Sequence, residues 1–166
     1  METGSAEDEK LVLGDFLPYL VNRAGIRTGQ SFAKDLERFG LTLTDWRILI
    51  ALSQADNQRL FELAELVVTD VSTLSRQVAG LQRAGLILRK RDRNDGRALS
   101  LALSAKARNL LRRIVPIARM HERVAVRGIN DDDLATLRRC ATIIYHNLEA
   151  FDDKADHYRV EPALGT

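Results

Sequence analysis

One stretch of the chain, residues 60–104, limits most strongly what this sequence can fold into. Its first half has two apolar runs at helical spacing around a short polar turn, which predicts helices over 60–67 and 71–84. Its second half has two short runs on either side of a segment rich in Asn, Asp and Gly, which predicts strands over 86–91 and 97–103. Two helices joined by a turn and followed by a hairpin form a winged helix-turn-helix.

The second of these helices is expected to have a core face and a polar face. Thr69 and Asp70 stand just before it, and both residue types are good N-caps. Apolar side chains near the 3.6-residue period are expected to face the core: Val71, Leu74, Val78 and Leu81. The opposite face carries small or basic side chains, namely Ser72, Arg76, Ala79 and Arg83, with Thr73 and Ser75 on its flanks. This composition suits a helix that enters the major groove of DNA, and it is also that of an ordinary solvated helix face.

The predicted hairpin places positive charge beside this helix. Gly85 stands where a left-handed helix C-cap is usual, and residues 92–96 are expected to form the turn between the strands. Residues 83–97 hold six Arg or Lys and two Asp, a net charge of +4. The wider segment 76–113 has eleven basic and two acidic residues, whereas 131–161 has eight acidic and four basic ones. One end of the folded protein is therefore expected to attract polyanions.

These residues resemble the MarR (multiple antibiotic resistance regulator) family of bacterial transcription regulators, over nearly the whole chain. The most specific part is the wing, where the family has an Asp, any residue, an Arg, a short apolar strand, and then Leu-Thr opening a helix. The matching residues are Asp95, Gly96, Arg97, the strand 99–103 and Ser104. Two departures are Ser104 in place of Thr and Ala107 in place of Gly. Since Ser is an equally good N-cap, the expected fold is unchanged.

The resemblance implies a homodimer that binds double-stranded DNA at a partly palindromic operator. In the family, the wing Arg, here Arg97, enters the minor groove and the neighbouring Asp, here Asp95, holds it in place. Together with the polar helix face, the expected DNA-contacting residues are Ser72, Thr73, Ser75, Arg76, Arg83, Arg93, Asp95 and Arg97.

The resemblance also implies a small-molecule effector that releases the protein from DNA. In the family, such ligands are often aromatic carboxylates or related phenolic compounds, and they lie between the dimerisation helices and the DNA-binding lobe. We expect Asn22, Arg23 and Trp46 at this site, because Arg can pair with a carboxylate and Trp can stack on a ring. A coenzyme A thioester is an alternative ligand. In the alternative reading of the residues, Trp46 belongs to the core and Arg23 is a surface or interface charge.

The predicted fold is all-α with a small β-wing. Helices are expected over 13–39, over 43–54 after a cap formed by Thr42 and Asp45, from Ser104 to Gly128, and from Asn130 to Phe151. The expected organisation is a mobile tail over 1–10, a dimerisation region formed by 11–40 and 104–156, and a winged-helix DNA-binding domain over 41–103.

Composition and motifs disfavour several other classes of protein. The 166 residues include a single cysteine, and the first ten residues lack the form of a signal peptide, so we expect a cytoplasmic protein without a membrane span. We find no catalytic motif and no metal-ligand spacing, and hence expect neither an enzyme nor a cofactor. His121, His146 and His157 are expected at the surface, the acidic run 131–133 as a helix start, and Cys140 as a buried small side chain.

Three alternatives to an effector-controlled regulator remain open. The chain could be a nonspecific architectural DNA-binding protein, a protein-interaction module that keeps the winged-helix fold, or a regulator that senses oxidants through Cys140.

Overall fold

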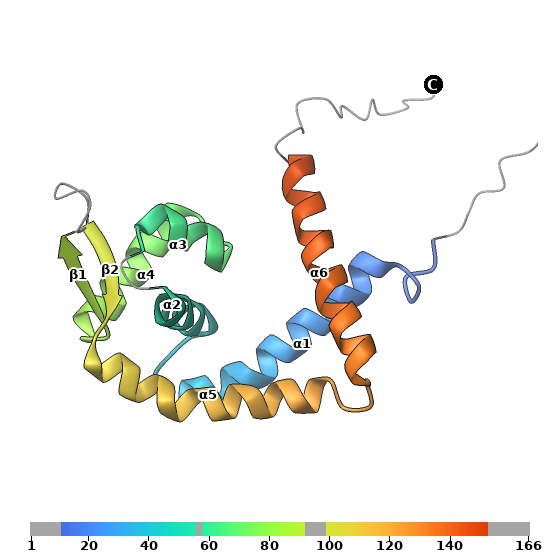
Figure 1. Ribbon diagram of the computed structural model, residues 1–166, viewed down its shortest axis with the longest axis horizontal. Coiled ribbons are helices and arrows are strands. Elements are labelled where there is room, and N and C mark those ends of the chain that lie inside the picture. The colour runs from blue at the N-terminus through green and yellow to red at the C-terminus, as the bar shows by residue number, and fades with distance from the viewer. Residues whose placement is uncertain (1–10, 56–57, 92–98, 153–166) are drawn as a thin grey trace, which may run out of the picture. The chain divides into compact units, whose positions relative to one another are not determined.

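The computed structural model describes residues 11–55, 58–91 and 99–152, and residues 1–10, 56–57, 92–98 and 153–166 lie outside the described part. The elements follow in the order α1 (Leu17–Glu37), α2 (Leu43–Gln54), α3 (Leu60–Val67), α4 (Val71–Arg83), β1 (Ile87–Arg91), β2 (Leu99–Leu103), α5 (Ala105–Ala125) and α6 (Asp131–Asp152) (Figure 1). The fold predicted from the sequence, helical with a small two-stranded wing, is confirmed.

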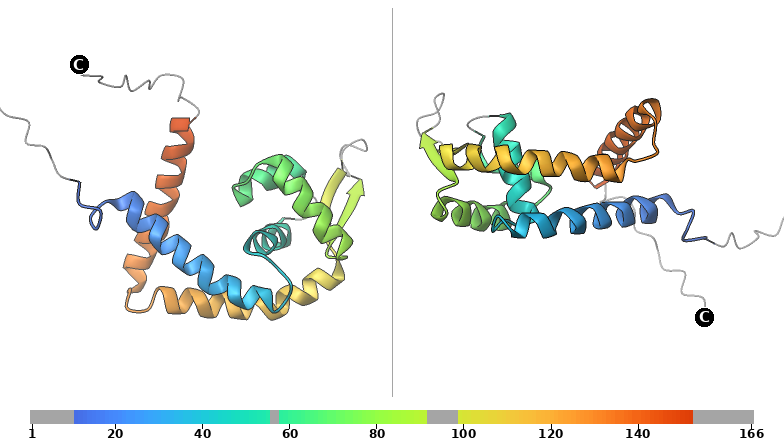
Figure 2. Two further views of the ribbon diagram at one scale, coloured as in Figure 1. Left: turned by 180° about the vertical axis from the view of Figure 1, so that it is seen from behind. Right: turned by 90° about the horizontal axis from the view of Figure 1, so that it is seen from below.

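The chain forms two compact units. The first extends to Ala125 and contains α1 to α5 with the two strands, and the second begins at Val126 and contains α6. Within the first unit, α1 runs alongside α5 and α2 packs against both (Figure 2). The expected division into a dimerisation region and a DNA-binding domain concerns an assembled dimer and stays a prediction.

The core of the first unit surrounds α2. The largest side chains that are fully buried come from five of its helices and from β1: Leu36, Ile48, Leu49, Leu52, Leu63, Leu74, Val78, Ile87 and Ile114. Leu74, Val78 and Leu81 confirm the predicted core face of α4. Val71 was predicted on the same face and is instead 48% exposed, because it is the first residue of the helix and lies beyond the edge of the core.

Local side-chain chemistry sets the helix ends near the predicted positions. The Asp45 amide donates to Thr42 Oγ1 over 3.1 Å and the Thr42 amide donates to Asp45 Oδ2 over 2.9 Å, which is the predicted cap of α2. After α4, Gly85 adopts the left-handed conformation at φ 71°, and the Leu86 amide donates back to the Leu81 carbonyl.

The wing is an antiparallel pair that is tied to the rest of the first unit at the middle of β2 and just after its C-terminal end. Ile87 pairs with Leu103 and Arg91 with Leu99. The Leu101 amide donates to the Gln58 carbonyl, which joins β2 to the segment before α3. Ser104 Oγ donates to the Gly85 carbonyl over 2.8 Å and accepts from the Ala107 amide over 3.0 Å. Ser104 therefore caps α5, as predicted, and also holds the end of α4.

The second unit contains one long amphipathic helix. Asn130 caps α6 by accepting a hydrogen bond from the Asp133 amide over 2.8 Å, as predicted. None of the α6 side chains that the structure describes is buried. Cys140 is accordingly exposed, and its predicted burial is wrong for the single chain because α6 has no core of its own within its unit. No helix in the described ranges has both the length and the apolar character needed to cross a membrane.

The turn between α3 and α4 contains a strained residue. Val68 ends α3 in the left-handed region, at φ 54° and ψ 61°, and is the one residue other than glycine that the described chain places at positive φ. A β-branched side chain is disfavoured there by roughly 1–2 kcal/mol. Because Val68 is 70% exposed, replacing it removes little packing.

We therefore expect Val68→Gly to stabilise the protein. Glycine raises the entropy of the unfolded chain, which opposes folding, but the relief of backbone strain should be larger than this cost. The net gain in the free energy of unfolding should be about 1 kcal/mol. Val68→Ala is the matched control and should gain less, because it keeps a Cβ atom in the left-handed region. Urea denaturation of the three proteins measures this, and an unchanged or lower midpoint for the glycine variant would contradict the strain argument.

Candidate functional site

The first turn of α4 is held together by Asp70. Its Oδ1 accepts a hydrogen bond from Ser72 Oγ over 2.6 Å and another from the Thr73 amide over 2.8 Å. These two donors hold the pKa of the Asp70 carboxyl far below its ordinary value. The carboxylate thus fixes the helix N-terminus at the end where a recognition helix approaches DNA.

The predicted polar face of α4 points away from the core. Ser72, Arg76 and Arg83 are exposed, whereas Thr73 and Ser75 are half-buried. Arg76 Nη2 donates to Thr73 Oγ1 over 3.3 Å, which keeps the guanidinium near the first turn. Exposed Val71 adds an apolar group next to Ser72 that the sequence pattern had assigned to the core.

Further basic side chains lie on the wing and on α5. β1 packs against α4 and carries exposed Arg89 and Lys90. Lys106 Nζ donates to the Ala84 carbonyl over 2.8 Å, just beyond the C-terminal turn of α4. The remaining predicted DNA contacts, which are Arg93, Asp95 and Arg97, lie outside the described residues. The structure therefore shows that Ser72, Arg76 and Arg83 of α4 are exposed, and contact with DNA stays a prediction both for α4 and for the wing tip.

A cavity of about 740 Å³ lies between α1, α2 and α5. Its lining is aromatic and aliphatic with several charged groups: Gly25, Arg27, Thr28, Gly29, Ser31, Phe32, Leu43, Trp46, Arg47, Ala118, His121, Glu122, Val124 and Ala125. The rings of Phe32 and Trp46 meet edge to face, with centroids 5.3 Å apart. Trp46 is half-buried. It packs on the core, as one interpretation of the sequence expected, and it also lines the cavity, as the other expected.

The other two predicted ligand residues are not in this cavity. Asn22 lines a neighbouring hollow of about 480 Å³ between α1 and α2, next to Gly25 and Arg47. Arg23 is exposed, and its guanidinium lies 5.9 Å from the centre of the Tyr19 ring. The arginines at the cavity are instead Arg27 and Arg47, which the sequence pattern did not indicate.

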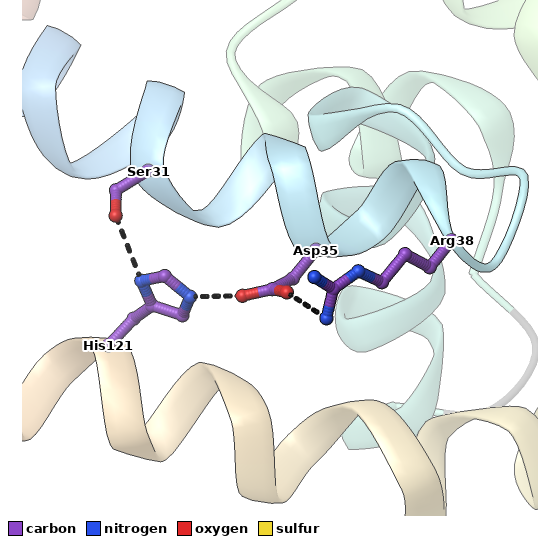
Figure 3. Close-up of polar contacts among 4 residues, drawn as sticks. All are labelled: Ser31, Asp35, Arg38 and His121. Carbon is purple, nitrogen blue, oxygen red and sulfur yellow. Dashed lines mark hydrogen bonds and ion pairs between the residues drawn. The ribbon is translucent and has the colours of Figure 1, made fainter.

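One wall of the cavity holds a chain of polar contacts between α1 and α5 (Figure 3). His121 Nε2 lies 2.8 Å from Asp35 Oδ2, and His121 Nδ1 lies 3.3 Å from Ser31 Oγ. Asp35 Oδ1 also pairs with Arg38 Nη1 over 3.0 Å. The hydrogen bond from His121, together with the charge of Arg38, holds the pKa of Asp35 below its ordinary value despite some desolvation.

The expectation that His121 lies at the surface is wrong, since only 19% of its side chain is exposed. The sequence did carry a signal for this burial. His121 follows buried Ile114 and half-buried Ala118 at intervals of four and three residues, which is the spacing of one helix face. His146 is exposed and contacts Glu149, as expected of a surface histidine, and His157 lies outside the described residues. Within the described ranges, no three His, Cys, Asp or Glu side chains group so as to hold a metal ion.

Comparison with known proteins gives consistent matches. Residues 41–99 match the profile of the MarR family. The HTH-type transcriptional repressor IacR of Pseudomonas putida is 22% identical over 81% of each protein. A MarR-family transcriptional regulator from Silicibacter pomeroyi, known from its crystal structure, is 28% identical, with a TM-score of 0.73 over 82% of this chain and 92% of that one.

A third match is CouR from Rhodococcus jostii, whose crystal structure contains p-coumaroyl-CoA. It has a TM-score of 0.76 over 81% of this chain and 95% of that one. At 21% identity, this likeness concerns the fold alone.

The cap of α4 should make stability depend on pH. Asp70→Ala removes both hydrogen bonds and should lower the free energy of unfolding at pH 7, whereas Asp70→Asn keeps an acceptor but not the charge and should lower it less. Folding lowers the pKa of the Asp70 carboxyl, so its charge stabilises the native state at pH values above 3.8, its ordinary pKa. This stabilisation is lost as the pH falls below that value. The gap between wild type and Asp70→Ala should therefore narrow between pH 5 and pH 2, as measured by denaturation at a series of pH values. A constant gap would show that the charge of Asp70 does not contribute.

Proposed function

Because the chain belongs to the MarR family of winged helix-turn-helix transcriptional regulators, we propose that it represses its target genes as an effector-controlled homodimer. The dimer would bind a partly palindromic operator and dissociate when a small aromatic acid or its thioester enters the cavity. The observation that carries the proposal is the exposed face of α4: Asp70 fixes the first turn of this helix, and Arg76 in the next turn faces solvent.

The face of α4 has the features that major-groove binding requires. Ser72 and Thr73 are small enough for the helix to approach the bases, and Arg76 is long enough to span the O6 and N7 atoms of a guanine. Exposed Val71 could pack on the methyl group of a thymine, an apolar contact made in the same groove. The basic wing would then follow the phosphates and the minor groove beside this site.

Exposed apolar side chains near the two ends of the chain support the proposed dimer. In the first unit they lie on α1 and the segment before it: Leu11, Val12, Leu13, Phe16, Leu17, Leu20, Val21 and Ile26. In the second unit they lie on α6: Leu137, Ile143, Tyr145, Leu148 and Phe151. Soluble proteins rarely leave so much apolar surface in contact with water, and such patches mark interfaces between subunits.

The cavity supports an effector with an aromatic body and an acidic group. Phe32 and Trp46 offer ring surfaces, while Arg27 and Arg47 are cations without a carboxylate partner in the described part of the chain. An Arg can bind a carboxylate through two parallel hydrogen bonds. The ligand in the CouR crystal structure, p-coumaroyl-CoA, is an aromatic thioester and so belongs to the class of effector proposed here.

The position of the cavity suggests how an effector would act. It lies between α1 and α5, which belong to the proposed dimerisation region, and α2, which packs against α3 and α4. The two recognition helices of a dimer fit one face of DNA only when they lie about one helical turn, roughly 34 Å, apart. A ligand that moves α2 by a few ångström would change this spacing and favour the unbound state.

The DNA contact should be tested with Arg76→Ala. If Arg76 reads a guanine, the variant should lose about 1–3 kcal/mol of operator binding and relax the preference at one base pair in each half-site. Arg83→Ala is a matched control on the same face, and its last-turn position predicts a smaller loss that is equal on all sequences. Titrations on operators with single-base changes, at several salt concentrations, separate the two variants.

Footprinting on the same operators decides between the proposal and a nonspecific architectural protein, which the basic segment 83–97 would also suit. Two protected half-sites support the regulator, and protection that ignores sequence supports the architectural protein. Equal loss of affinity for Arg76→Ala on every sequence would make Arg76 a phosphate contact.

The oligomeric state should depend on the apolar residues of α6. Leu137→Glu places a charge on the exposed apolar surface of this helix, so it should shift the protein toward monomer at micromolar concentration. Phe61→Glu is the control, because Phe61 is an equally exposed apolar residue on α3, outside the proposed interface. Sedimentation velocity measures both variants. A wild-type protein that sediments as a stable folded monomer would overturn the dimer.

A further inference from the structure

The outer face of α5 carries a row of arginines. At roughly 100° per residue, Arg112, Arg119 and Arg123 lie within about 40° of one another, on the side of the helix away from buried Ile114. All three side chains are exposed to solvent. They belong neither to the core nor to the lining of the cavity between α1, α2 and α5. We call these three arginines the α5 stripe.

Positive charge dominates this helix. α5 has six Arg or Lys residues and one acidic residue, Glu122, which is turned by about 60–100° from the stripe. Among the residues that the structure describes, no carboxylate pairs with an arginine of the stripe, and Arg112 donates instead to the Asn109 side chain. Arginines clustered along one helix face are the electrostatic signature of a surface that binds nucleic acid.

The stripe lies on a different side of the first unit from the polar face of α4. Both helices bury one face in the same core, and α2 contacts both. The first turn of α5 is tied to the end of α4 by the hydrogen bond from Lys106 to Ala84. Beyond its first two turns, α5 lies on the other side of α2 from α3 and α4 (Figure 1, Figure 2). A straight duplex that contacts Arg76 is therefore not positioned to run along the stripe.

A phosphate backbone suits this surface in both chemistry and length. Each member is an Arg, whose planar guanidinium binds a phosphate through two parallel hydrogen bonds. From Arg112 to Arg123 the helix rises about 17 Å, a length over which each strand of a duplex carries about five phosphates. A membrane surface suits it less, because an interfacial helix needs a free apolar face and that of α5 is buried in the core.

The stripe is expected to stay at the surface of the proposed dimer. The apolar side chains that support this dimer lie on α1, on the segment before it and on α6. Charged residues are depleted at the centres of subunit interfaces, and the stripe consists of charged residues alone.

Resting on the proposed function, we propose that the α5 stripe is a second DNA-binding surface. It binds the phosphates of another duplex without reading their sequence while α4 holds the operator, so that one dimer bridges two segments of DNA. Each arginine that neutralises a phosphate adds about 0.9 to the slope of log K against log salt. Three such contacts weaken the binding of the second duplex about 40-fold between 50 and 200 mM salt.

The alternative is that these arginines only keep the outer face of α5 solvated. Both roles leave operator binding by α4 unchanged and place the side chains in water, so neither stability nor operator affinity separates them. Capture of a second duplex by the operator complex does separate them, because a solvated face captures none.

The experiment is surface plasmon resonance with the full-length protein. An operator duplex, selected from the genomic fragments that the protein retains, is immobilised and saturated with protein. A duplex of scrambled sequence is then passed over the surface. Wild type should capture this duplex at about 50 mM salt and lose it steeply as the salt is raised to about 200 mM, whereas operator without protein should capture none.

Two triple variants test the stripe itself. With all three arginines changed to Gln, the protein should bind the operator as wild type does and capture the second duplex at least about tenfold more weakly. With all three changed to Lys, the charge remains and most of the capture should return. If the triple Gln variant does not fold, Arg119→Gln alone should still reduce the salt slope of capture by about 0.9.

A charge-matched control removes three positive charges outside α5. Lys34→Gln, Arg38→Gln and Arg139→Gln combined change exposed side chains on α1, just after it and on α6. This control should capture the second duplex as wild type does. A loss equal to that of the triple Gln variant would mean that net charge alone is responsible, and the stripe would then not be a site.

Three results would overturn the inference: no capture by the wild-type complex, equal capture by the triple Gln variant, or loss of operator affinity in that variant, which would place the stripe against the operator. Capture of phosphatidylserine vesicles or polyglutamate in place of the duplex would also overturn it, because the stripe would then bind another polyanion.

Footprinting of the wild type separates this inference from the proposed function. Two protected half-sites without capture of a second duplex refute the second surface alone. Stripe-dependent retention of scrambled duplexes without any protected half-site refutes the proposed function.

Discussion

The burial of α2 is the constraint on which the rest of the first unit depends. Ile48, Leu49 and Leu52 are fully inaccessible to water, and this helix contacts α1, α3, α4, α5 and β2. A close-packed interior transmits displacement, because few voids are available to absorb it. A helix that is packed against five other elements therefore cannot shift far without moving some of them. In the proposed mechanism, this packing is what would couple the cavity on one side of α2 to α4 on the other.

Polar side chains determine where three helices of the first unit begin. Asp70, Thr42 and Ser104 each accept a hydrogen bond from an amide in the first turn of a helix. Such caps are local, and so they could be recognised in the sequence by residue type and spacing. Ser104 shows what the sequence could not reveal, because its hydroxyl also donates to Gly85, nineteen residues earlier in the chain. That contact exists only when the hairpin has folded back onto α4.

The sequence predicted the elements better than it predicted the environment of single side chains. Val71, His121 and Cys140 were each assigned the wrong burial. Periodicity defines the faces of a helix but not where the core that covers one of them ends. Val71 lies beyond that edge. His121 lies within it and contacts Asp35 of α1, which is 86 residues earlier in the chain. Cys140 is exposed because no core covers α6 within its unit.

Sequence alone determined the order of helices and strands, the caps that bound them and the polar face of α4, because these depend on interactions between residues a few positions apart. Tertiary structure alone decided which charged side chains share the cavity. The sequence pattern selected Arg23, but packing of α1 against α2 and α5 brings Arg27, Arg47 and His121 there instead. The physical reason is that a cavity is lined by the residues left facing the gap after distant helices have packed, and local spacing does not encode that gap.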